Sequence, residues 1–279
     1  MTTVTNEQST ANMEHRSWTA GTPAQHRGRH EHHHSWKGIV MDLQGQRVVI
    51  LGGTSGIGLA TAKAAARCGA EVTVISRQPA SVDRALAELP PGAGGRAADL
   101  TDPALVGRLF GDLGDIDHLV FTAGEPLALM NLAALDLDRA REFFALRYFG
   151  ALWAVHAAAP HLRPGGSITL TTGIAGRRPG PGWAVAASIC GAVESLTRAL
   201  AVELAPIRVN AVCPGVVRSP LWASMTPASR EQLYHDTAAA IPAGRVGEAG
   251  DIAHAYLFCL TEPFATGSIL TVDGGTALA

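Results

Sequence analysis

Short apolar and β-branched runs alternate with longer Ala- and Leu-rich stretches from Gly45 onward. The short runs predict strands, and the first and fourth are continuously apolar or β-branched, as strands covered on both faces require. Strands alternating with helices predict an α/β fold with a parallel sheet and helices on both faces. The candidate strands are Arg47–Leu51, Glu71–Ile75, His118–Thr122, Ser167–Thr171, Arg208–Val212 and Ser268–Val272.

The stretches between these strands carry helical signals. Thr101 or Asp102 is a candidate N-cap, because Pro103 suits the first helical turn. Glu194 and Arg198 are spaced to pair at i,i+4. A further helix is expected to start at Thr226–Pro227. The other expected helices are Gly58–Cys68, Asp138–Ala158 and the stretch Trp183–Pro206, whose Val193, Leu196, Leu200 and Leu204 share one face.

The N-terminal segment differs from the rest of the chain. Residues 1–40 are polar and contain "HRGRHEHHH" at His26–His34, without helical or strand periodicity. They predict a disordered, His-rich tail ahead of one folded domain over residues 41–279. Imidazoles bind transition metals, but compositional bias favours a solvated tail, so no metal site is predicted.

Composition and charge narrow the class of protein. The chain has 279 residues, of which 47% are apolar and 16% charged, which is ample for one large buried core. A net charge of −2 gives no indication of nucleic acid or an anionic membrane as partner. No continuous apolar run of membrane-spanning length and no secretory signal is visible. Four widely spaced cysteines fit reduced thiols in a cytoplasmic protein.

A glycine-rich turn follows the first strand in "VVILGGTSGIGLATA". Gly52 permits a tight turn, Gly56 lets the backbone approach a pyrophosphate, and Gly58 allows close helix–strand packing. The helix that follows offers free N–H groups and a positive dipole end to phosphate. The predicted loop comprises Gly52, Thr54, Ser55, Gly56, Ile57 and Gly58. The pattern is informative because it follows a strand and opens a helix.

The ends of the next two strands bear on the choice of cofactor. Ser76 and Arg77 stand where an acidic residue would grip a ribose 2′-hydroxyl and repel a 2′-phosphate. A guanidinium pairs with phosphate, so NADP is favoured over NAD, the alternative being that Arg77 is an ordinary solvated arginine. Asp99 and Leu100 follow the third strand, where an acceptor meets the adenine amino group.

Together these segments resemble the short-chain dehydrogenase/reductase family, from about Asp42 to the C-terminus. The motifs are "GGTSGIG", "LAVELAPIRVNAVCPGVV", "GRVGEAGDIAHAYLFCL" and "TGSILTVDGG". The resemblance implies a single-domain Rossmann-type, doubly wound parallel sheet, a nicotinamide cofactor, a small carbonyl or alcohol substrate, and a homodimer or homotetramer. Ser219 would then meet the nicotinamide amide. The further cofactor-binding positions that the resemblance implies are Ala123, Gly124, Pro214, Gly215 and Val217.

The match fails where family members carry their proton-handling Asn, Ser, Tyr and Lys. Those positions fall on Arg147, Gly173, Ala186 and Cys190, respectively. The chain has three tyrosines and two lysines, and no Tyr-x-x-x-Lys pair. Other departures are Leu51 before the glycine turn and "FTAG" at Phe121–Gly124, where Asn-Asn-Ala-Gly is usual.

Two residues are candidates for the missing chemistry. Arg147 is expected to point toward the vacated centre, where a fixed cation stabilises an oxyanion but is a poor proton donor. Thr172, beside the missing Ser, is a candidate hydroxyl. The alternatives are an Arg147 that fills space by bonding backbone carbonyls and a Thr172 that only packs. Cys190 is expected to be an inert buried thiol rather than a nucleophile, because no base is placed beside it.

These observations leave three functional hypotheses. The favoured one is an NADP(H)-dependent oxidoreductase with a non-standard active site, acting on a carbonyl, alcohol or imine. The others are a catalytically silent nicotinamide sensor or partner subunit, and a non-redox isomerase, lyase or cyclase. The loop "GRRPGPGW" (Gly176–Trp183) and the segment from Pro220 to Ala240 are expected to border the substrate pocket, the latter as a lid.

Overall fold

Seven parallel strands form the central sheet of the protein, which is described here from a computed structural model covering residues 41–279. The spatial order is β3-β2-β1-β4-β5-β6-β9, and all neighbouring strands run parallel. The strands are β1 (Arg47–Leu51), β2 (Glu71–Ser76), β3 (Gly94–Ala97), β4 (Ile116–Phe121), β5 (Leu162–Thr171), β6 (Arg208–Pro214) and β9 (Ile269–Val272). The predicted α/β fold, a Rossmann-type doubly wound sheet, is therefore confirmed. The His-rich segment and its predicted disorder lie outside the described residues.

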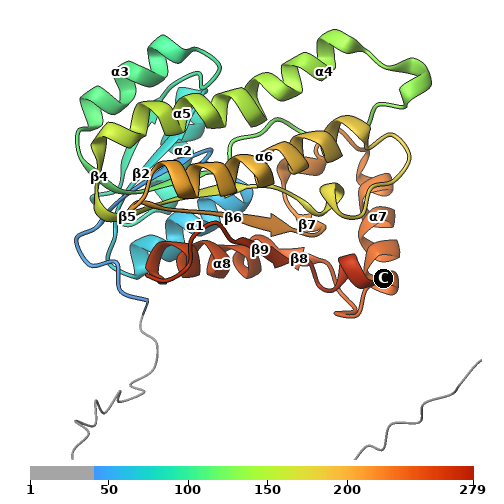
Figure 1. Cartoon of the computed structure of the whole chain (residues 1–279). Coiled ribbons are helices and arrows are strands. Elements are labelled where there is room, and N and C mark those ends of the chain that lie inside the picture. Colours follow the sequence, from blue (N-terminus) through green and yellow to red (C-terminus); the bar gives the residue numbers. More distant parts are fainter. Residues whose placement is uncertain (1–40) are drawn as a thin grey trace, which may run out of the picture. The chain divides into compact units, whose positions relative to one another are not determined.

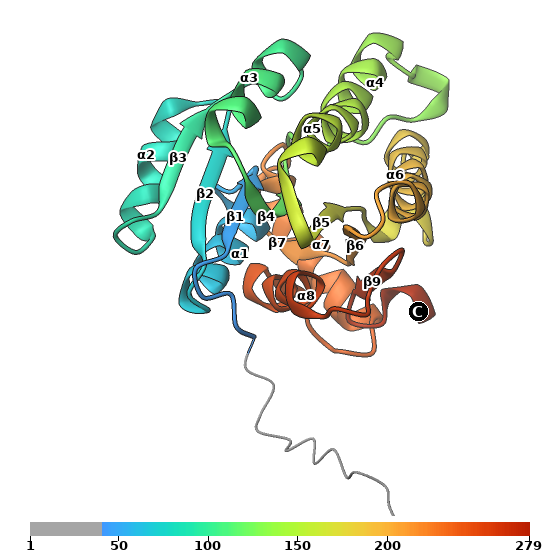
Figure 2. The same cartoon turned by 60° about the vertical axis from the view of Figure 1, so that its left-hand side comes forward.

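Helices cover both faces of this sheet (Figures 1 and 2). On one face, α1 and α8 pack against each other and, with α2, enclose a buried apolar cluster. On the other face, α3, α5 and α6 enclose a second cluster. Continuous burial in β1 and β6 follows from this two-sided cover. The helices are α1 (Gly56–Arg67), α2 (Pro79–Glu88), α3 (Pro103–Leu113), α4 (Leu137–Phe144), α5 (Ala151–Ala158), α6 (Ala184–Glu203), α7 (Pro227–Ala240) and α8 (Ala249–Thr261).

The chain reverses its direction across the sheet between β1 and β4. β1 pairs with β2 on one side and with β4 on the other. In open parallel sheets, ligands bind at the carboxyl ends of the strands beside such a reversal, because the following loops diverge there. The candidate site is therefore expected at the ends of β1 and β4.

Most predicted elements are found within a few residues of their expected limits. Asp102 caps α3, since its side chain accepts from the amides of Ala104 and Leu105. Thr226 caps α7 in the same way, as its position before Pro227 predicted. The short ribbon of β7 (Val217–Arg218) and β8 (Gly247–Glu248) was not predicted, because two residues carry no periodicity.

The predicted helix Asp138–Ala158 is present as one unbroken run of helical backbone, with one irregularity. A π-helical turn at Ala145–Gly150 separates α4 from α5, and Arg147 lies within it. Gly150 closes the turn where a Cβ atom would approach the Leu100 carbonyl oxygen to 3.1 Å. Such turns shift the phase of the following helix and often occur at functional sites.

Helix α6 is long and apolar enough to cross a membrane by length and composition, with a mean hydropathy of 1.4. In the fold it lies against β6 and buries Ile189, Val193 and Leu200 on the sheet. The predicted pair of Glu194 and Arg198 is present on this helix at 3.4 Å.

Buried polar groups are concentrated near the amino ends of β4, β5 and β6. His118 Nδ1 lies 2.8 Å from Ser167 Oγ, and its Nε2 lies 2.5 Å from Gln46 Oε1. Arg208 donates to the carbonyls of Cys259 and Leu260 at the end of α8, where a cation is favourable. Burial, aided by the charge of Arg208, lowers the pKa of His118 to about 4 from its usual 6.5. This histidine is therefore neutral in the folded protein at neutral pH.

We expect His118 to make the free energy of unfolding depend on pH. Its folded-state pKa is depressed, so its contribution is complete above pH 6.5 and declines as the pH falls toward 4. The linked loss is about 3 kcal/mol, since each pKa unit corresponds to ~1.4 kcal/mol. Urea denaturation of the wild type and His118→Asn at pH 7 and pH 4.5 measures it. The variant should lose less stability over this interval, whereas exposed His156→Asn should behave as wild type; equal pH dependence in all three proteins would contradict the assignment.

Candidate active site

The turn between β1 and α1 makes a cradle of backbone atoms. Gly52 has a φ of +85°, and a Cβ atom there would lie 2.5 Å from the amide nitrogen of Ala123. A Cβ atom at Gly58 would lie 2.3 Å from the Gly52 carbonyl oxygen. Ser55 is the N-cap residue of α1, but its side chain makes no capping hydrogen bond. The side chain of Ser55 therefore leaves the first backbone N–H groups of the helix unbonded. The backbone of this turn, including Thr54 and Ile57, is therefore open to an anion.

The ends of β2 and β3 lie beside this turn because their strands are neighbours. Arg77 is exposed immediately after Ser76, the last residue of β2. Asp99 accepts hydrogen bonds from the amide and hydroxyl of Thr101, and these bonds, with the nearby charge of Arg77, keep its pKa below the usual value. Leu100 is buried.

The loop after β6 approaches the same edge. A Cβ atom at Gly56 would contact Pro220 Cδ at 3.0 Å and Ser219 Cβ at 3.5 Å, so this loop lies against the glycine turn. Gly215 is tied to β9 by its amide, which donates to the Val272 carbonyl. The predicted positions from four separate segments thus meet along the carboxyl edge of the sheet.

A cavity opens at this edge, next to the predicted cofactor-binding positions. Its wall includes Ala123, Pro214 and Gly215, and it is otherwise largely apolar and aromatic. The four positions that were compared with the family's proton-handling residues all line it: Arg147, Gly173, Ala186 and Cys190. Neither a tyrosine nor a lysine is among the described residues of its wall.

Arg147 reaches the cavity wall from the π-helical turn. Its Nη2 donates to the backbone carbonyl of Glu125, and its Nε lies 3.4 Å from Glu125 Oε2. Its guanidinium carbon lies 5.5 Å from the ring centroid of Phe143. Burial lowers the pKa of Arg147, and the carboxylate of Glu125 opposes that shift. The predicted cation is therefore at the cavity, and it is paired.

Glu125 is the residue that sequence reasoning missed. It directly follows Gly124 in the loop after β4, and no spacing rule links it to Arg147, which is 22 positions away. Arg147 reaches this loop from the π-helical turn. A Cβ atom at Gly124 would lie 2.7 Å from Nη1 of Arg147, so glycine leaves room for the approach.

The hydroxyl groups on the cavity wall donate to backbone carbonyls. Thr172 donates to Cys190 at 3.1 Å, Thr122 to Leu51 at 3.1 Å, and Thr171 to Phe121 at 2.5 Å. Burial raises the pKa of the Cys190 thiol, which agrees with the inert thiol expected from the sequence. Arg147 is consequently the charged group on this wall.

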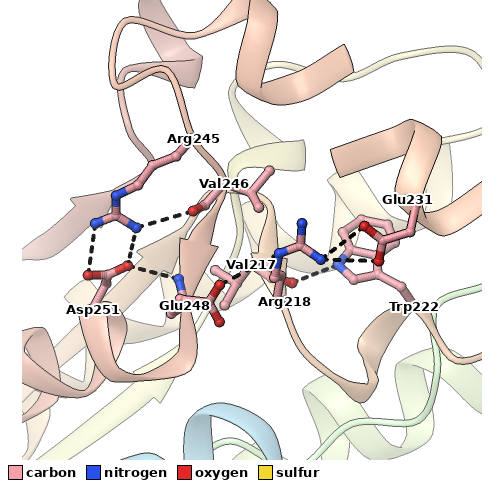
Figure 3. A network of polar contacts seen from close by, with 8 residues as sticks. All are labelled: Val217, Arg218, Trp222, Glu231, Arg245, Val246, Glu248 and Asp251. Atoms are coloured by element: carbon pink, nitrogen blue, oxygen red, sulfur yellow. Dashed lines mark hydrogen bonds and ion pairs between the residues drawn. The ribbon is translucent and has the colours of Figure 1, made fainter. Parts of the chain in front are cut away.

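The cavity wall includes two tryptophans, Trp222 from the segment expected to form a lid and Trp183 from the end of the loop before α6. Trp222 donates from Nε1 to the Val217 carbonyl at 3.0 Å (Figure 3). Its ring centroid lies 6.4 Å from that of Trp183. Arg218 fastens α7 by two 3.1 Å contacts with Glu231. Of the loop Gly176–Trp183, which was expected to border the substrate pocket, Trp183 lines the cavity.

Comparison with known proteins agrees with this architecture. The sequence profile of a family described as enoyl-(acyl carrier protein) reductase matches residues 52–277. Short-chain dehydrogenase/reductase malC of Malbranchea aurantiaca is 32% identical over 253 residues, covering 85% of this chain and 96% of malC. The chain belongs to the short-chain dehydrogenase/reductase family.

Solved structures of family members superpose on the protein. The structure of MalC Reductase/Diels-Alderase from Malbranchea aurantiaca has a TM-score of 0.79 at 30% identity, covering 86% of this chain and 99% of that one. A small-chain dehydrogenase in complex with NADPH gives 0.75 at 35% identity, covering 85% and 100%. A Pseudomonas aeruginosa PAO1 oxidoreductase described as containing an atypical catalytic center gives 0.77 at 28% identity, covering 85% and 99%.

The residues present fit the nicotinamide dinucleotide that the family binds. A side chain at Gly52 or Gly58 would collide with backbone atoms. A phosphate-binding turn of this kind needs glycine at such positions because its backbone is closely packed. The ends of β1, β2 and β4 and the loop after β6 form a continuous border from this turn to the cavity. The turn and the ends of β2 and β3 would hold the adenosine phosphates, while Ala123, Pro214 and Gly215 would hold the reactive end.

We expect Gly58→Ala to weaken the binding of NADPH by at least about tenfold, equivalent to ~1.4 kcal/mol. The added methyl group would meet the Gly52 carbonyl oxygen and displace the turn. Fluorescence titration with NADPH measures the affinity. Gly107→Ala in α3 is the matched control, since nothing lies within 4 Å of its added Cβ atom; equal affinity for both variants would argue against the turn as the phosphate site.

Proposed function

We propose that the protein is an NADP(H)-dependent oxidoreductase with a non-standard active site centred on Arg147, acting on a small carbonyl, alcohol or imine. The observation that carries this proposal is the polar content of the cavity wall. The three threonine hydroxyls donate to backbone carbonyls, whereas the guanidinium of Arg147 retains N–H groups beyond its bond to Glu125. A substrate oxygen or nitrogen that develops negative charge would meet this cation.

The choice of NADP rests on Arg77. Its exposed guanidinium follows β2, where a ribose 2′-phosphate would lie beside the phosphate turn. The carboxylate of Asp99 interacts with this positive charge from the next strand end. The family member in complex with NADPH, at 35% identity, supports the same choice.

The residues of the cavity then have distinct roles. When bound, the nicotinamide supplies or accepts the hydride. Arg147 holds the negative charge that develops on the substrate, and it stays protonated because guanidinium does not deprotonate in proteins. The Thr172 hydroxyl donates a hydrogen bond to the backbone carbonyl of Cys190, so its oxygen would accept a hydrogen bond from a substrate N–H or O–H group. Water supplies the exchangeable proton in this proposal, since the buried Cys190 thiol has a raised pKa.

A second candidate function is a non-redox cyclisation or isomerisation in the same cavity. It is favoured by the apolar wall, where Trp183, Trp222 and Phe143 would shape a folded substrate. The structural relative described as a reductase/Diels-Alderase supports it. This reaction would proceed equally with oxidised and reduced cofactor, which distinguishes it from the first candidate. A silent nicotinamide sensor would bind cofactor with no turnover of either kind.

We also propose a cytoplasmic homodimer or homotetramer. All four cysteines are free thiols, in keeping with a reducing compartment. Large apolar side chains are exposed along α4, the π-helical turn and α5, including Leu137, Phe149 and Trp153. An exposed apolar face of this kind is typical of a surface that another protein covers.

We expect Arg147→Met to lower NADPH consumption by about 100-fold or more with a panel of ketones, aldehydes, imines and activated alkenes, because the charge that stabilises the transition state is lost. Arg147→Lys should retain part of the rate. Steady-state kinetics on the panel, with NADPH affinity measured separately, gives the comparison. Turnover by the methionine variant at the wild-type rate would rule out the assigned role, and absence of turnover by the wild type would count against redox chemistry.

We expect Arg77→Asp to reverse the cofactor preference. The carboxylate would repel a 2′-phosphate and accept a bond from a 2′-hydroxyl, so NADPH binding should weaken by about 100-fold while NADH binding improves. Paired titrations with the two cofactors measure the ratio. Arg178→Asp, on the exposed loop after β5, is the control; an unchanged ratio in Arg77→Asp would show that this arginine is only solvated.

A further inference from the structure

The ion pair of Arg147 and Glu125 contains two buried polar atoms that make no hydrogen bond. The two side chains are 21% and 30% exposed, yet Arg147 Nε and Glu125 Oε2 are both buried atoms without a hydrogen bond. They face each other at 3.4 Å. Burying a charge is costly unless it is paired, so each group compensates the other even without ideal geometry.

The contacts around the guanidinium restrict it on three sides. Glu125 faces its Nε and Nη2 edge, with the carboxylate on one atom and the backbone carbonyl on the other. Phe143 lies against its face, and Gly124 lies beside Nη1. Within the described part of the chain, no hydrogen bond involves Nη1. The Nε and Nη2 edge is thus held by a single residue, whereas Nη1 keeps its hydrogen-bonding capacity on the wall of the cavity.

We propose that Glu125 is a positioning residue that holds Arg147 in the orientation its chemistry needs. It acts through the guanidinium and not on the substrate, since Arg147 lines the cavity and Glu125 lies beside it. The carboxylate fixes the Nε edge and compensates the buried positive charge. The expected effect of Glu125 on turnover rests on the proposed function. The restraint that Glu125 places on Arg147 does not, because it exists in the protein without substrate.

Loss of the carboxylate has a defined physical consequence. A glutamine at this position keeps the backbone carbonyl and the side-chain shape, but it leaves the guanidinium without a compensating charge. The guanidinium would then turn toward water at the cavity mouth. Its N–H groups would no longer point at one fixed place, and misplacement of a catalytic group by about 1 Å costs as much as ~100-fold in rate.

Two readouts on the full-length protein test this role. The first is steady-state kinetics of Glu125→Gln, for which kcat should fall by about 10- to 100-fold while NADPH affinity stays unchanged. The second needs no turnover: modification of Arg147 by phenylglyoxal, followed by peptide mass spectrometry, should be severalfold faster in Glu125→Gln than in wild type. Glu142→Gln, an exposed glutamate of α4, is the matched control and should match wild type in both.

Each result decides the matter. If the wild type turns over a substrate, a lower kcat together with faster modification supports the role, and either change alone overturns it. If the wild type turns over no substrate, the proposed function fails, but the modification rate still tests whether Glu125 restrains Arg147. Should Glu125→Gln fold poorly by circular dichroism, Glu125→Asp replaces it. This variant keeps the charge on a shorter side chain. Its kcat should therefore fall, and modification of Arg147 should become faster, each by less than is expected of Glu125→Gln. Wild-type values of both readouts in the variant that folds would overturn the role.

Discussion

The close backbone contact between the glycine turn after β1 and the end of β4 is the constraint on which the site depends. Gly52 and Gly58 have no room for a side chain, because carbonyl and amide atoms of the turn and of Ala123 occupy that space. The amide of Thr122 also bonds the Leu51 carbonyl at 2.8 Å, which joins the two strand ends. With this contact in place, the helix N-terminus, the loop after β4 and the cavity share one edge of the sheet.

The cavity at that edge combines apolar walls with one buried charge. Such a charge is stable only when another group compensates it, and Glu125 supplies that group. In an apolar environment, the same charge interacts more strongly with a substrate than it would in water. The arrangement therefore suits electrostatic stabilisation better than proton transfer, in agreement with hydroxyl groups that donate to backbone carbonyls.

Backbone hydrogen bonds join the loops around the cavity to one another. The amide of Leu127 donates to the Leu221 carbonyl at 2.7 Å, and that of Met130 donates to the Gly182 carbonyl at 2.9 Å. Arg218 of β7 and Tyr234 of α7 add a cation–π contact at 4.4 Å. Three segments distant in sequence thus enclose one apolar space, which favours a substrate with a hydrophobic body.

The sequence by itself determined most of the sheet, most of its helical cover and the glycine turn, because these follow from local periodicity, caps and the steric freedom of glycine. Strand β3 and helix α2 lay outside the predicted ranges. Through its resemblance to the family, it also placed Arg147, Gly173, Ala186 and Cys190 around one centre, and all four line the cavity. It did not determine the π-helical turn or the partner of Arg147. Those depend on how Gly150 packs against Leu100 and how Gly124 admits the guanidinium. Only the tertiary structure decided them, since contacts between segments far apart in the chain leave no periodic signal in either segment.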